Sequence, residues 1–392
     1  MRRLCFLFLC FFCIACEQFE PTAPGNSSIL DGAVDGLNEA ENLQFLRGDA
    51  AFNNQIFTAS TGLGPLFVAT SCGSCHAGDG KGHPFSTLTR FGQVNETGNQ
   101  FLNQGGPQLQ HHAIPGFAPE QVPTGATFTK LLPPANTGLG FLDVVSDAEI
   151  LAWADPNDVD GDGISGVANW IELKSYVSPR AESISQNGKY MARFGKKGST
   201  YDLLQQTAQA YNQDIGITSS YESIDTQSGV EFDPEISNQI IQDVVFYLKT
   251  LKAPVPRQQD DAVLGKDLFL SIGCGKCHRV EMKTVNTPIQ SLAHKTFHPY
   301  TDLLLHDMGS GLDDGYTEGS ATTSEWRTPP LWGLGLSKNS QGGQYFLLHD
   351  GRASSLEEAI LLHGGEATQI RNNFNSLTEE ERNNLIRFLE SL

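Results

Sequence analysis

The amino-acid sequence predicts a mainly α-helical chain of two similar halves, the first of which carries a long loop-rich insertion. Three observations support this fold class. The pattern Cys-x-x-Cys-His occurs twice, at 72–76 and at 274–278. A similar apolar helix is predicted to close each half, with the sequence VFYLKTL at 245–251 and IRFLESL at 386–392. Nothing in either half alternates strongly enough between apolar and polar residues to demand a sheet.

The N-terminal segment MRRLCFLFLCFFCIACEQFE predicts export. Arg2 and Arg3 precede an apolar run at 4–15, which is too short to span a membrane. The run ends Cys-Ile-Ala-Cys, which resembles the lipobox of bacterial lipoproteins. We therefore expect a signal peptide at 1–16, a lipid on Cys16 and a flexible tether at 17–37. The mature protein would be anchored to a membrane and face the periplasm or the cell exterior. A simple secretory signal, cut nearby, is the alternative.

Cysteine use and charge narrow the possible functions. Of the eight cysteines, four lie in the signal and four in the two motifs, so none is left for a disulfide framework. The formal net charge of −19 argues against nucleic acid as a partner. An acidic surface suits a basic redox protein as a partner. Ordinary solvation of the surface by water explains the excess of acidic residues equally well.

The boundary between the halves is predicted near residue 255. Ile236, Ile240, Val244 and Leu248 recur at four-residue spacing on one helical face, and the segment KAPVPRQQDD at 252–261 reads as a linker. The last helix is predicted to begin at Thr378, with Glu381 completing a capping box. This gives an N-terminal domain at 38–255, with its insertion at about 85–235, and a C-terminal domain at 256–392.

The repeated motif has three chemical interpretations. It can attach a c-type haem through both thiols, with the adjacent His as the axial iron ligand. It can contribute to a zinc site, which needs four ligands, or form a redox-active dithiol. The haem interpretation is favoured because a His follows both cysteine pairs, the chain is exported, and the intervening residues are small or flexible. Cys72, Cys75, Cys274 and Cys277 would then attach two haems, with His76 and His278 as proximal ligands, in two cytochrome c-like domains.

A sixth iron ligand for the second haem is predicted from local sequence. The segment ASSLEEAILLHGG at 353–365 reads as a short capped helix that places His363 on its apolar face. The alternative role for His363 is that of a buried side chain bonded to a backbone carbonyl. Met308, in LLLHDMGSG at 303–311, is the rival ligand, or else packs in the core.

No sixth ligand is evident for the first haem. The polar loop GGPQLQHHAIPGFAPE at 105–120 supplies Gln110, His112 and Glu120 as candidate catalytic residues. Beside a haem with an open site, such groups could move a proton between the two oxygens of peroxide. The same loop could instead be a polar cover.

The segment DPNDVDGDGISG at 155–166 matches the first half of a calcium loop. Asp158, Asp160 and Asp162 alternate and a glycine follows, but Asn169 stands where the usual bidentate Glu would be. Calcium binding and a solvated acidic turn both fit this pattern.

Several stretches together resemble the di-haem oxidoreductase family of peroxidases, which is related to bacterial di-haem cytochrome c peroxidases. These stretches lie at 71–82, 160–170, 302–315, 325–335 and 349–367. The resemblance implies that the first haem reduces hydrogen peroxide. Electrons would enter at the second haem from a small redox protein of cytochrome c or cupredoxin type. The position of His363 resembles the one that supplies the distal ligand of the second haem in these relatives.

The sequence departs from these peroxidases in one respect. They carry a tryptophan between the haems, within a Trp-Asp-Gly-Arg stretch of the first half, and this chain has its Asp-Gly-Arg only at 350–352. Trp153 and Trp170 are the candidates for that place. Two other functions remain open: electron transfer without catalysis, with both irons six-coordinate, and oxidation of the side chains of a partner protein.

Overall fold

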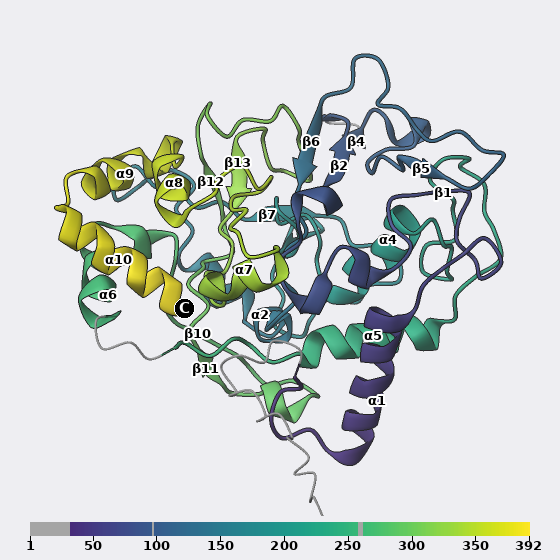
Figure 1. The fold of residues 1–392 in the computed structure, drawn as a ribbon, viewed down its shortest axis with the longest axis horizontal. Coiled ribbons are helices and arrows are strands. Elements are labelled where there is room, and N and C mark those ends of the chain that lie inside the picture. The colour runs from purple at the N-terminus through teal and green to yellow at the C-terminus, as the bar shows by residue number, and fades with distance from the viewer. Residues whose placement is uncertain (1–31, 96–97, 258–261) are drawn as a thin grey trace, which may run out of the picture.

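The computed structural model describes residues 32–95, 98–257 and 262–392 (Figure 1). Helices account for 33% of the structure and strands for 13%. Helix therefore predominates, but less strongly than the predicted mainly α class implies. The α-helices are α1 (Glu39–Asp49), α2 (Leu139–Asp143), α3 (Asp147–Leu151), α4 (Leu203–Asp214), α5 (Asn238–Thr250), α6 (Ala262–Ser271), α7 (Ser337–Ser340), α8 (Leu356–Leu361), α9 (Thr368–Asn375) and α10 (Glu379–Ser391).

The strands are short and pair antiparallel in small two- and three-stranded sheets. The pairs are β1 (Leu66–Phe67) with β5 (His112–Ala113), β2 (Leu88–Phe91) with β6 (Phe128–Leu131), β3 (Val94–Asn95) with β4 (Gly98–Asn99), β10 (Met282–Lys283) with β11 (Thr296–Phe297), and β12 (Leu305–Asp307) with β13 (Glu325–Arg327). The three-stranded sheet has the order β7 (Asn169–Ile171), β9 (Lys189–Ala192), β8 (Ser185–Gln186). Most of these strands lie in the insertion, where we expected only loops and short helices.

The helix starts predicted from capping signals are confirmed, but the helix predicted within 353–365 ends at Leu361, so His363 lies outside it. Thr378 and Glu381 form the capping box of α10. The hydroxyl of Ser355 accepts a hydrogen bond from the backbone of Glu358 and so caps α8. In α5, the predicted Val244 and Leu248 are buried, whereas Ile236 lies before the helix begins. These capping signals depend on residues close together in sequence, so they do not depend on how distant segments pack.

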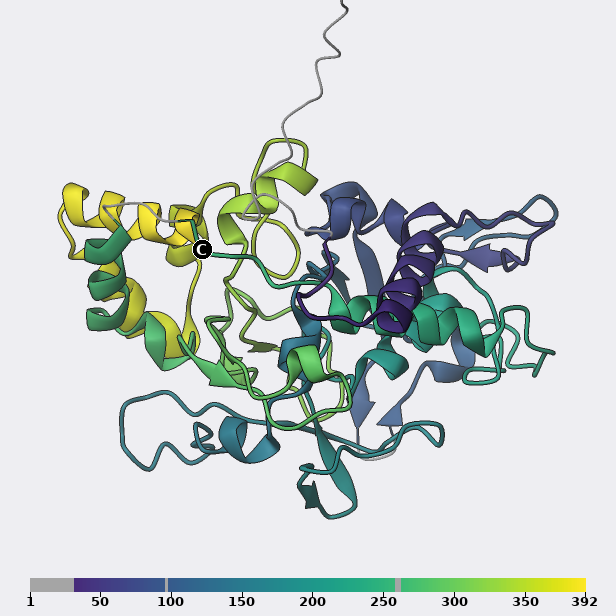
Figure 2. The same cartoon turned by 90° about the horizontal axis from the view of Figure 1, so that it is seen from below.

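Each half contains a close crossing of two helices at a glycine. A Cβ on Gly48 of α1 would lie 2.1 Å from the carbonyl oxygen of Asp243 in α5. A Cβ on Gly265 of α6 would lie 2.2 Å from the carbonyl oxygen of Asn384 in α10. Only glycine permits backbones to approach this closely. Figures 1 and 2 show the two helix pairs on opposite sides of the molecule.

Two main hydrophobic cores lie beside these crossings. The second core is composed of buried residues from 269–392, including Phe269, Phe374 and Phe388. The first core is built mainly from residues before 255 but also includes Phe297 and Trp332 from beyond it. The second part of the chain therefore contributes to both cores.

The described part of the predicted tether is held by the first domain. The backbone amide of Val34 donates to the carbonyl of Thr250 (2.8 Å), and the amide of Lys252 donates to the carbonyl of Gly32 (2.9 Å). The predicted signal peptide, the lipid site Cys16 and the rest of the tether up to residue 31 lie outside the described residues. Among the described helices, none has the length and apolar character needed to cross a membrane.

We predict that Gly265→Ala destabilises the second domain by about 1–3 kcal/mol, because the new methyl group overpacks the crossing of α6 and α10. Urea unfolding followed by circular dichroism measures the change. Gly311→Ala is the matched control, since its Cβ would have no neighbour within 4 Å and its backbone is not in the left-handed region. Equal stability of the two variants would contradict the role given to this crossing.

Candidate functional site

A cavity of about 440 Å³ lies where the two cores meet, and both Cys-x-x-Cys-His motifs line it. Its walls are mainly apolar and come from both halves of the chain. Phe52, Val244 and Leu248 line it from the first core, and Phe269 and Leu389 from the second. The residues of the motifs that line it are Cys72, Cys75, His76, Cys274, Cys277 and His278.

The two motifs have the same local conformation. A 3₁₀ turn begins at the first cysteine of each, η3 (Cys72–Ser74) and η7 (Cys274–Lys276). In both, the amide of the histidine donates to the carbonyl of the first cysteine, at 3.1 Å in the first motif and 3.0 Å in the second. This turn brings both thiols and the imidazole to the same wall of the cavity.

The thiols do not have the properties of a redox dithiol, and neither motif forms a zinc site from its own residues. All four cysteines are free, and burial raises the pKa of Cys72, Cys75 and Cys274 to about 12. A redox-active thiol needs the opposite shift. Within the described ranges, neither motif brings its two sulfurs and its imidazole within 4.8 Å of one another, as a shared metal ion would require.

Each of the two motif histidines has one ring nitrogen bonded to a backbone carbonyl and the other free for a metal. Nδ1 of His76 lies 3.0 Å from the carbonyl oxygen of Pro134, and Nδ1 of His278 lies 2.9 Å from that of Tyr300. Each Nδ1–H donates to this carbonyl, which leaves the lone pair of Nε2 for a metal. Burial lowers the pKa of both imidazoles to about 4, so both are neutral at pH 7. The thiols, imidazoles and apolar walls fit one haem in each half of the cavity.

His363 lies two residues after the end of α8 and lines the half of the cavity beside His278. Its Nδ1 lies 2.7 Å from the carbonyl oxygen of Ala359, so it donates there and Nε2 stays free. His363 and His278 are near enough that each charge would disfavour the other, since His363 lowers the pKa of His278 after the larger effect of burial. This placement agrees with the predicted distal role. Met308 also lines the cavity, but it packs against a small cluster of Leu131, Leu312 and Trp326.

Helix α4 of the first half and α8 of the second half share a local pattern. Each begins at a capping side chain, Asp202 for α4 and Ser355 for α8. Counted from the cap, the same positions line the cavity: Leu203, Gln206, Thr207 and Ala210 in α4, and Leu356, Ala359, Ile360 and His363 in and after α8. Where the second half has His363, the first half therefore has Ala210.

The cavity face of α4 carries polar groups that we did not predict. The hydroxyl groups of Thr207 and Tyr211 are buried and have no hydrogen-bond partner among the described residues. Asp214, one turn further, also lines the cavity. Burial raises the pKa of Asp214 to about 7, although Arg90 acts in the opposite direction. The sequence signal that could have found them is the cap at Asp202, which sets the register of the helix.

The three candidate catalytic residues lie outside this cavity, because the loop at 105–120 packs on the far side of α4 and β1. The side-chain amide of Gln110 donates to the carbonyls of Asn212 and Gln213. His112 is exposed, and its Nδ1 lies 2.9 Å from the carbonyl oxygen of Val68. Glu120 accepts a hydrogen bond from the amide of Gln110 (2.7 Å). None of the three lines the cavity with His76, so their geometry does not support the predicted role.

The acidic loop at 155–166 is assembled differently from the predicted calcium set. Asp158 and Asp160 group with Asp155, with their oxygens within 4.8 Å of one another. Asp162 instead forms an ion pair with Lys276, inside the second motif (2.9 Å). In Figure 2 this part of the insertion (blue) reaches beneath the second half. Calcium binding stays a prediction, now with Asp155 in place of Asp162.

His306 also connects this loop with the second motif, through hydrogen bonds that involve Glu366. It is buried between the carboxylates of Asp302 (2.9 Å) and Glu366 (2.7 Å). Burial opposes its charge, but the hydrogen bonds with these partners raise the pKa of His306 well above its usual value. Glu366 also accepts hydrogen bonds from the amide and hydroxyl of Ser165.

The tryptophans that line the cavity are Trp326 and Trp332, whereas Trp153 and Trp170 do not line it. The ring of Trp326 stacks on His349 with ring centres 3.7 Å apart, and the ammonium of Lys197 lies over the ring at 3.9 Å from its centre. The place that we assigned to Trp153 or Trp170 is therefore better filled from β13 or the loop that follows it.

Comparison with known proteins gives one family match. A family model described as "Di-haem oxidoreductase, putative peroxidase" matches residues 132–392, which include the second motif. No curated protein matches the chain. Hydrazine synthase of Kuenenia stuttgartiensis has 13% sequence identity and a TM-score of 0.40, with 100% of both chains covered. A MauG-like protein associated with microbial copper homeostasis has 13% identity and a TM-score of 0.32, covering 65% of this chain and 88% of its own.

We predict that the double substitution Cys274→Ser/Cys277→Ser halves the covalently bound haem, from two per chain to one. The thiols of the second motif are lost, while the first motif keeps its own turn. Mass spectrometry of the denatured protein counts the attached groups. Ser74→Ala, which changes a residue of the first motif that carries no thiol, should retain two. An unchanged mass in the double variant would contradict attachment at these cysteines.

Proposed function

Since the chain belongs to the di-haem oxidoreductase family, we propose that it reduces hydrogen peroxide in the first half of the cavity. Each peroxide would take two electrons and two protons and yield two water molecules. Cys72 and Cys75 would hold one c-type haem with His76 as its axial ligand, and Cys274, Cys277 and His278 would hold the other. When bound, the haem irons supply the one-electron redox centres and the position at which peroxide binds.

The observation that carries the proposal is the pairing of Ala210 with His363. Both lie eight residues after the capping side chain of a helix and both line the cavity, although Ala210 lies within α4 and His363 follows α8. An imidazole at this position closes the second site, whereas a methyl group leaves the first site open to a small ligand. A pure electron-transfer protein has no need for this difference, because both of its irons can be six-coordinate.

Asp214 is the residue proposed to move the proton. Its carboxyl group faces the cavity one helical turn from Ala210, and its raised pKa of about 7 lets it exchange a proton near neutral pH. The charged and titratable groups around it are Arg90 and the thiols of Cys72 and Cys75. The free hydroxyl groups of Thr207 and Tyr211 would orient the substrate.

The source of the electrons is a further part of the proposal. We place electron entry at the second haem, from a small basic redox protein of cytochrome c or cupredoxin type, in keeping with the net charge of −19. Both motifs line one cavity with Trp326 and Trp332, which supports direct transfer between the haems. Export and a lipid on Cys16 would place this reaction on the outer side of a membrane.

We predict that Ala210→His abolishes peroxide reduction by giving the first haem a second imidazole ligand. Low-temperature electron paramagnetic resonance should show a high-spin signal in the wild-type protein and only low-spin signals in the variant. Gln209→His, at the preceding position of α4 and away from the cavity, is the matched control and should keep the high-spin signal. Two low-spin signals in the wild type would favour the electron-transfer function.

We predict that Asp214→Asn lowers kcat/KM for peroxide by about 10²–10⁴-fold above pH 7, where the wild-type carboxyl group is ionised and can accept a proton. Below pH 7 the wild-type group keeps its proton, so the wild-type rate falls and the two proteins converge. Stopped-flow measurements across pH 5–9 test both statements. Glu120→Gln is the control, because burial also raises the pKa of Glu120 to about 7 but it lies outside the cavity. If kcat/KM of Asp214→Asn still changed with pH near 7 as in the wild type, this role would be contradicted.

A further inference from the structure

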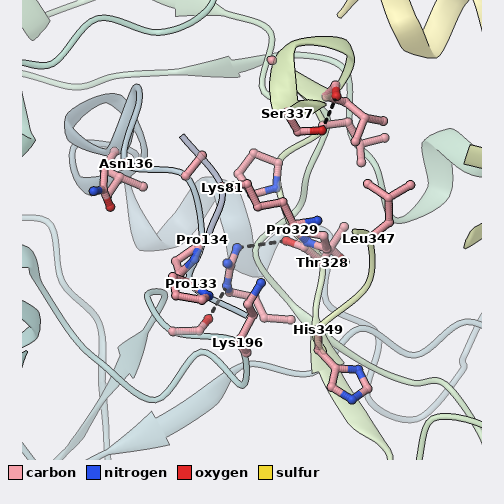
Figure 3. A pocket seen from close by; sticks show the side chains of 18 of the residues that line it. Lys81, Pro133, Pro134, Asn136, Lys196, Thr328, Pro329, Ser337, Leu347 and His349 are labelled. Atoms are coloured by element: carbon pink, nitrogen blue, oxygen red, sulfur yellow. Dashed lines mark hydrogen bonds between the residues drawn. The ribbon is translucent and has the colours of Figure 1, made fainter. Parts of the chain in front are cut away.

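Two lysines on the cavity wall have no counter-charge. Lys81 follows the first motif, and Lys196 follows β9; both side chains line the cavity. Figure 3 shows them on one stretch of the wall, with Pro133 and Pro134 to one side and Thr328 and Pro329 to the other. Neither ammonium has a hydrogen bond or an ion pair with any residue of the described chain.

The neighbouring Lys197, in the same segment, has hydrogen-bond acceptors and an acidic partner for its ammonium group. Its ammonium donates to the carbonyls of Thr322, Thr323 and Glu325, at 3.0–3.1 Å, and lies 3.7 Å from Asp314. Lys196 points to the other side of this segment and meets none of these acceptors. Lys196 faces the cavity and Lys197 does not, which explains why only Lys197 reaches these acceptors.

The electrostatic surroundings of Lys81 and Lys196 are unfavourable for two cations. Burial lowers the pKa of Lys81 to about 8 and that of Lys196 well below its usual value, and Lys81 and Arg327 lower the latter further. Asp350 favours the charge of Lys196 from a distance, but its carboxylate is paired with Arg352 at 2.7 Å. Two cations without a paired carboxylate on one wall leave that wall short of negative charge.

The backbones of both lysines are fixed by the second half of the chain. The carbonyl of Lys81 accepts a hydrogen bond from the hydroxyl of Ser340 (2.7 Å), and the carbonyl of Lys196 accepts one from the amide of Arg327 (3.0 Å). Both lysines thus lie where the two halves are in contact, and they are near enough for Lys81 to lower the pKa of Lys196. Two such cations suit an anion with two carboxylate oxygens, or two carboxylates side by side.

We propose that Lys81 and Lys196 bind the propionate carboxylates of the haem attached at Cys72 and Cys75. A c-type haem is tethered through its vinyl edge and carries its two propionates on another edge. In the first half the cysteines are near the acid Asp214, while Lys196 is near enough to His76 to lower its pKa after the larger effect of burial. The acid Asp214 thus acts on the thiols, whereas the cation Lys196 acts on the imidazole. The proposal rests on haem attachment and not on peroxide reduction.

The test is the midpoint potential of each haem, measured by spectroelectrochemical titration of the protein carrying both haems. Ferric haem has one more positive charge than ferrous haem, so removing a cation beside it favours the ferric form. Lys196→Met and Lys81→Met should each shift the ferric–ferrous equilibrium of the first haem at least tenfold toward ferric, a fall of about 59 mV. The second haem should change less. Lys196→Arg should restore the potential.

Lys189→Met is the control, because Lys189 is exposed on β9 in the same segment. Covalent haem is counted in every variant by mass spectrometry, since thioether attachment does not depend on these lysines. Potentials unchanged within error in both Met variants, with two haems per chain, would overturn the proposal. So would a crystal structure of the wild-type protein in which both propionates lie beyond ion-pair distance, about 4 Å, of these ammonium groups.

A free anion is the other possible source of negative charge beside the lysines, and the same titration of the midpoint potential distinguishes it from the propionates. Tethered propionates give a wild-type potential that does not respond to chloride or phosphate at constant ionic strength. A potential that depends on the concentration of either anion would show that a diffusible ion occupies the lysine pair, and would overturn the proposal. Peroxidase activity does not enter either readout, so failure here leaves the proposed reaction untouched.

Discussion

The close backbone contact between two helices in each half is the constraint on which the rest of the structure depends. Gly48 lets α1 approach α5, and Gly265 lets α6 approach α10. Each closing helix then turns its other face to the cavity, through Val244 and Leu248 in α5 and Leu385 and Leu389 in α10. A phenylalanine beside each crossing also packs near the motif imidazole, with ring centres 6.0 Å apart for Phe52 and His76 and 6.4 Å apart for Phe269 and His278.

The two halves share this frame and differ in what faces the irons they are proposed to hold. The histidine-to-carbonyl bonds at Pro134 and Tyr300 are alike, so the proximal sides are equivalent. Eight residues after the caps of α4 and α8, a methyl group and an imidazole line the cavity, at Ala210 and His363. The proposed difference in function between the two halves would therefore depend largely on one side chain, with the hydroxyl and carboxyl groups of α4 beside it in the first half.

Sequence reasoning succeeded where the signal was local. The motif turns, the caps at Ser355 and Thr378, and the place of His363 on the cavity wall all depend on residues a few positions apart. It failed where partners come from distant segments. Glu120 looked suitable because it lies in a polar loop, but nothing local to that loop shows that it packs away from His76. Asp162 matched a calcium pattern, yet its partner Lys276 lies in the other half of the chain. The polar face of α4 was missed because the helix has few strong apolar repeats.

The ion pair between Asp162 and Lys276 also has a consequence for how the protein matures. The insertion belongs to the first half, yet it reaches the second motif, and His306 closes over the sulfur of Cys277 at 3.6 Å. In this folded arrangement the thiols of the second motif are only partly exposed. Attachment of the proposed haem to these sulfurs would therefore be easiest while the insertion and the segment at 302–308 are still undocked. The contacts between the two halves would thus favour an order of assembly in which cofactor attachment precedes the final closure of the chain.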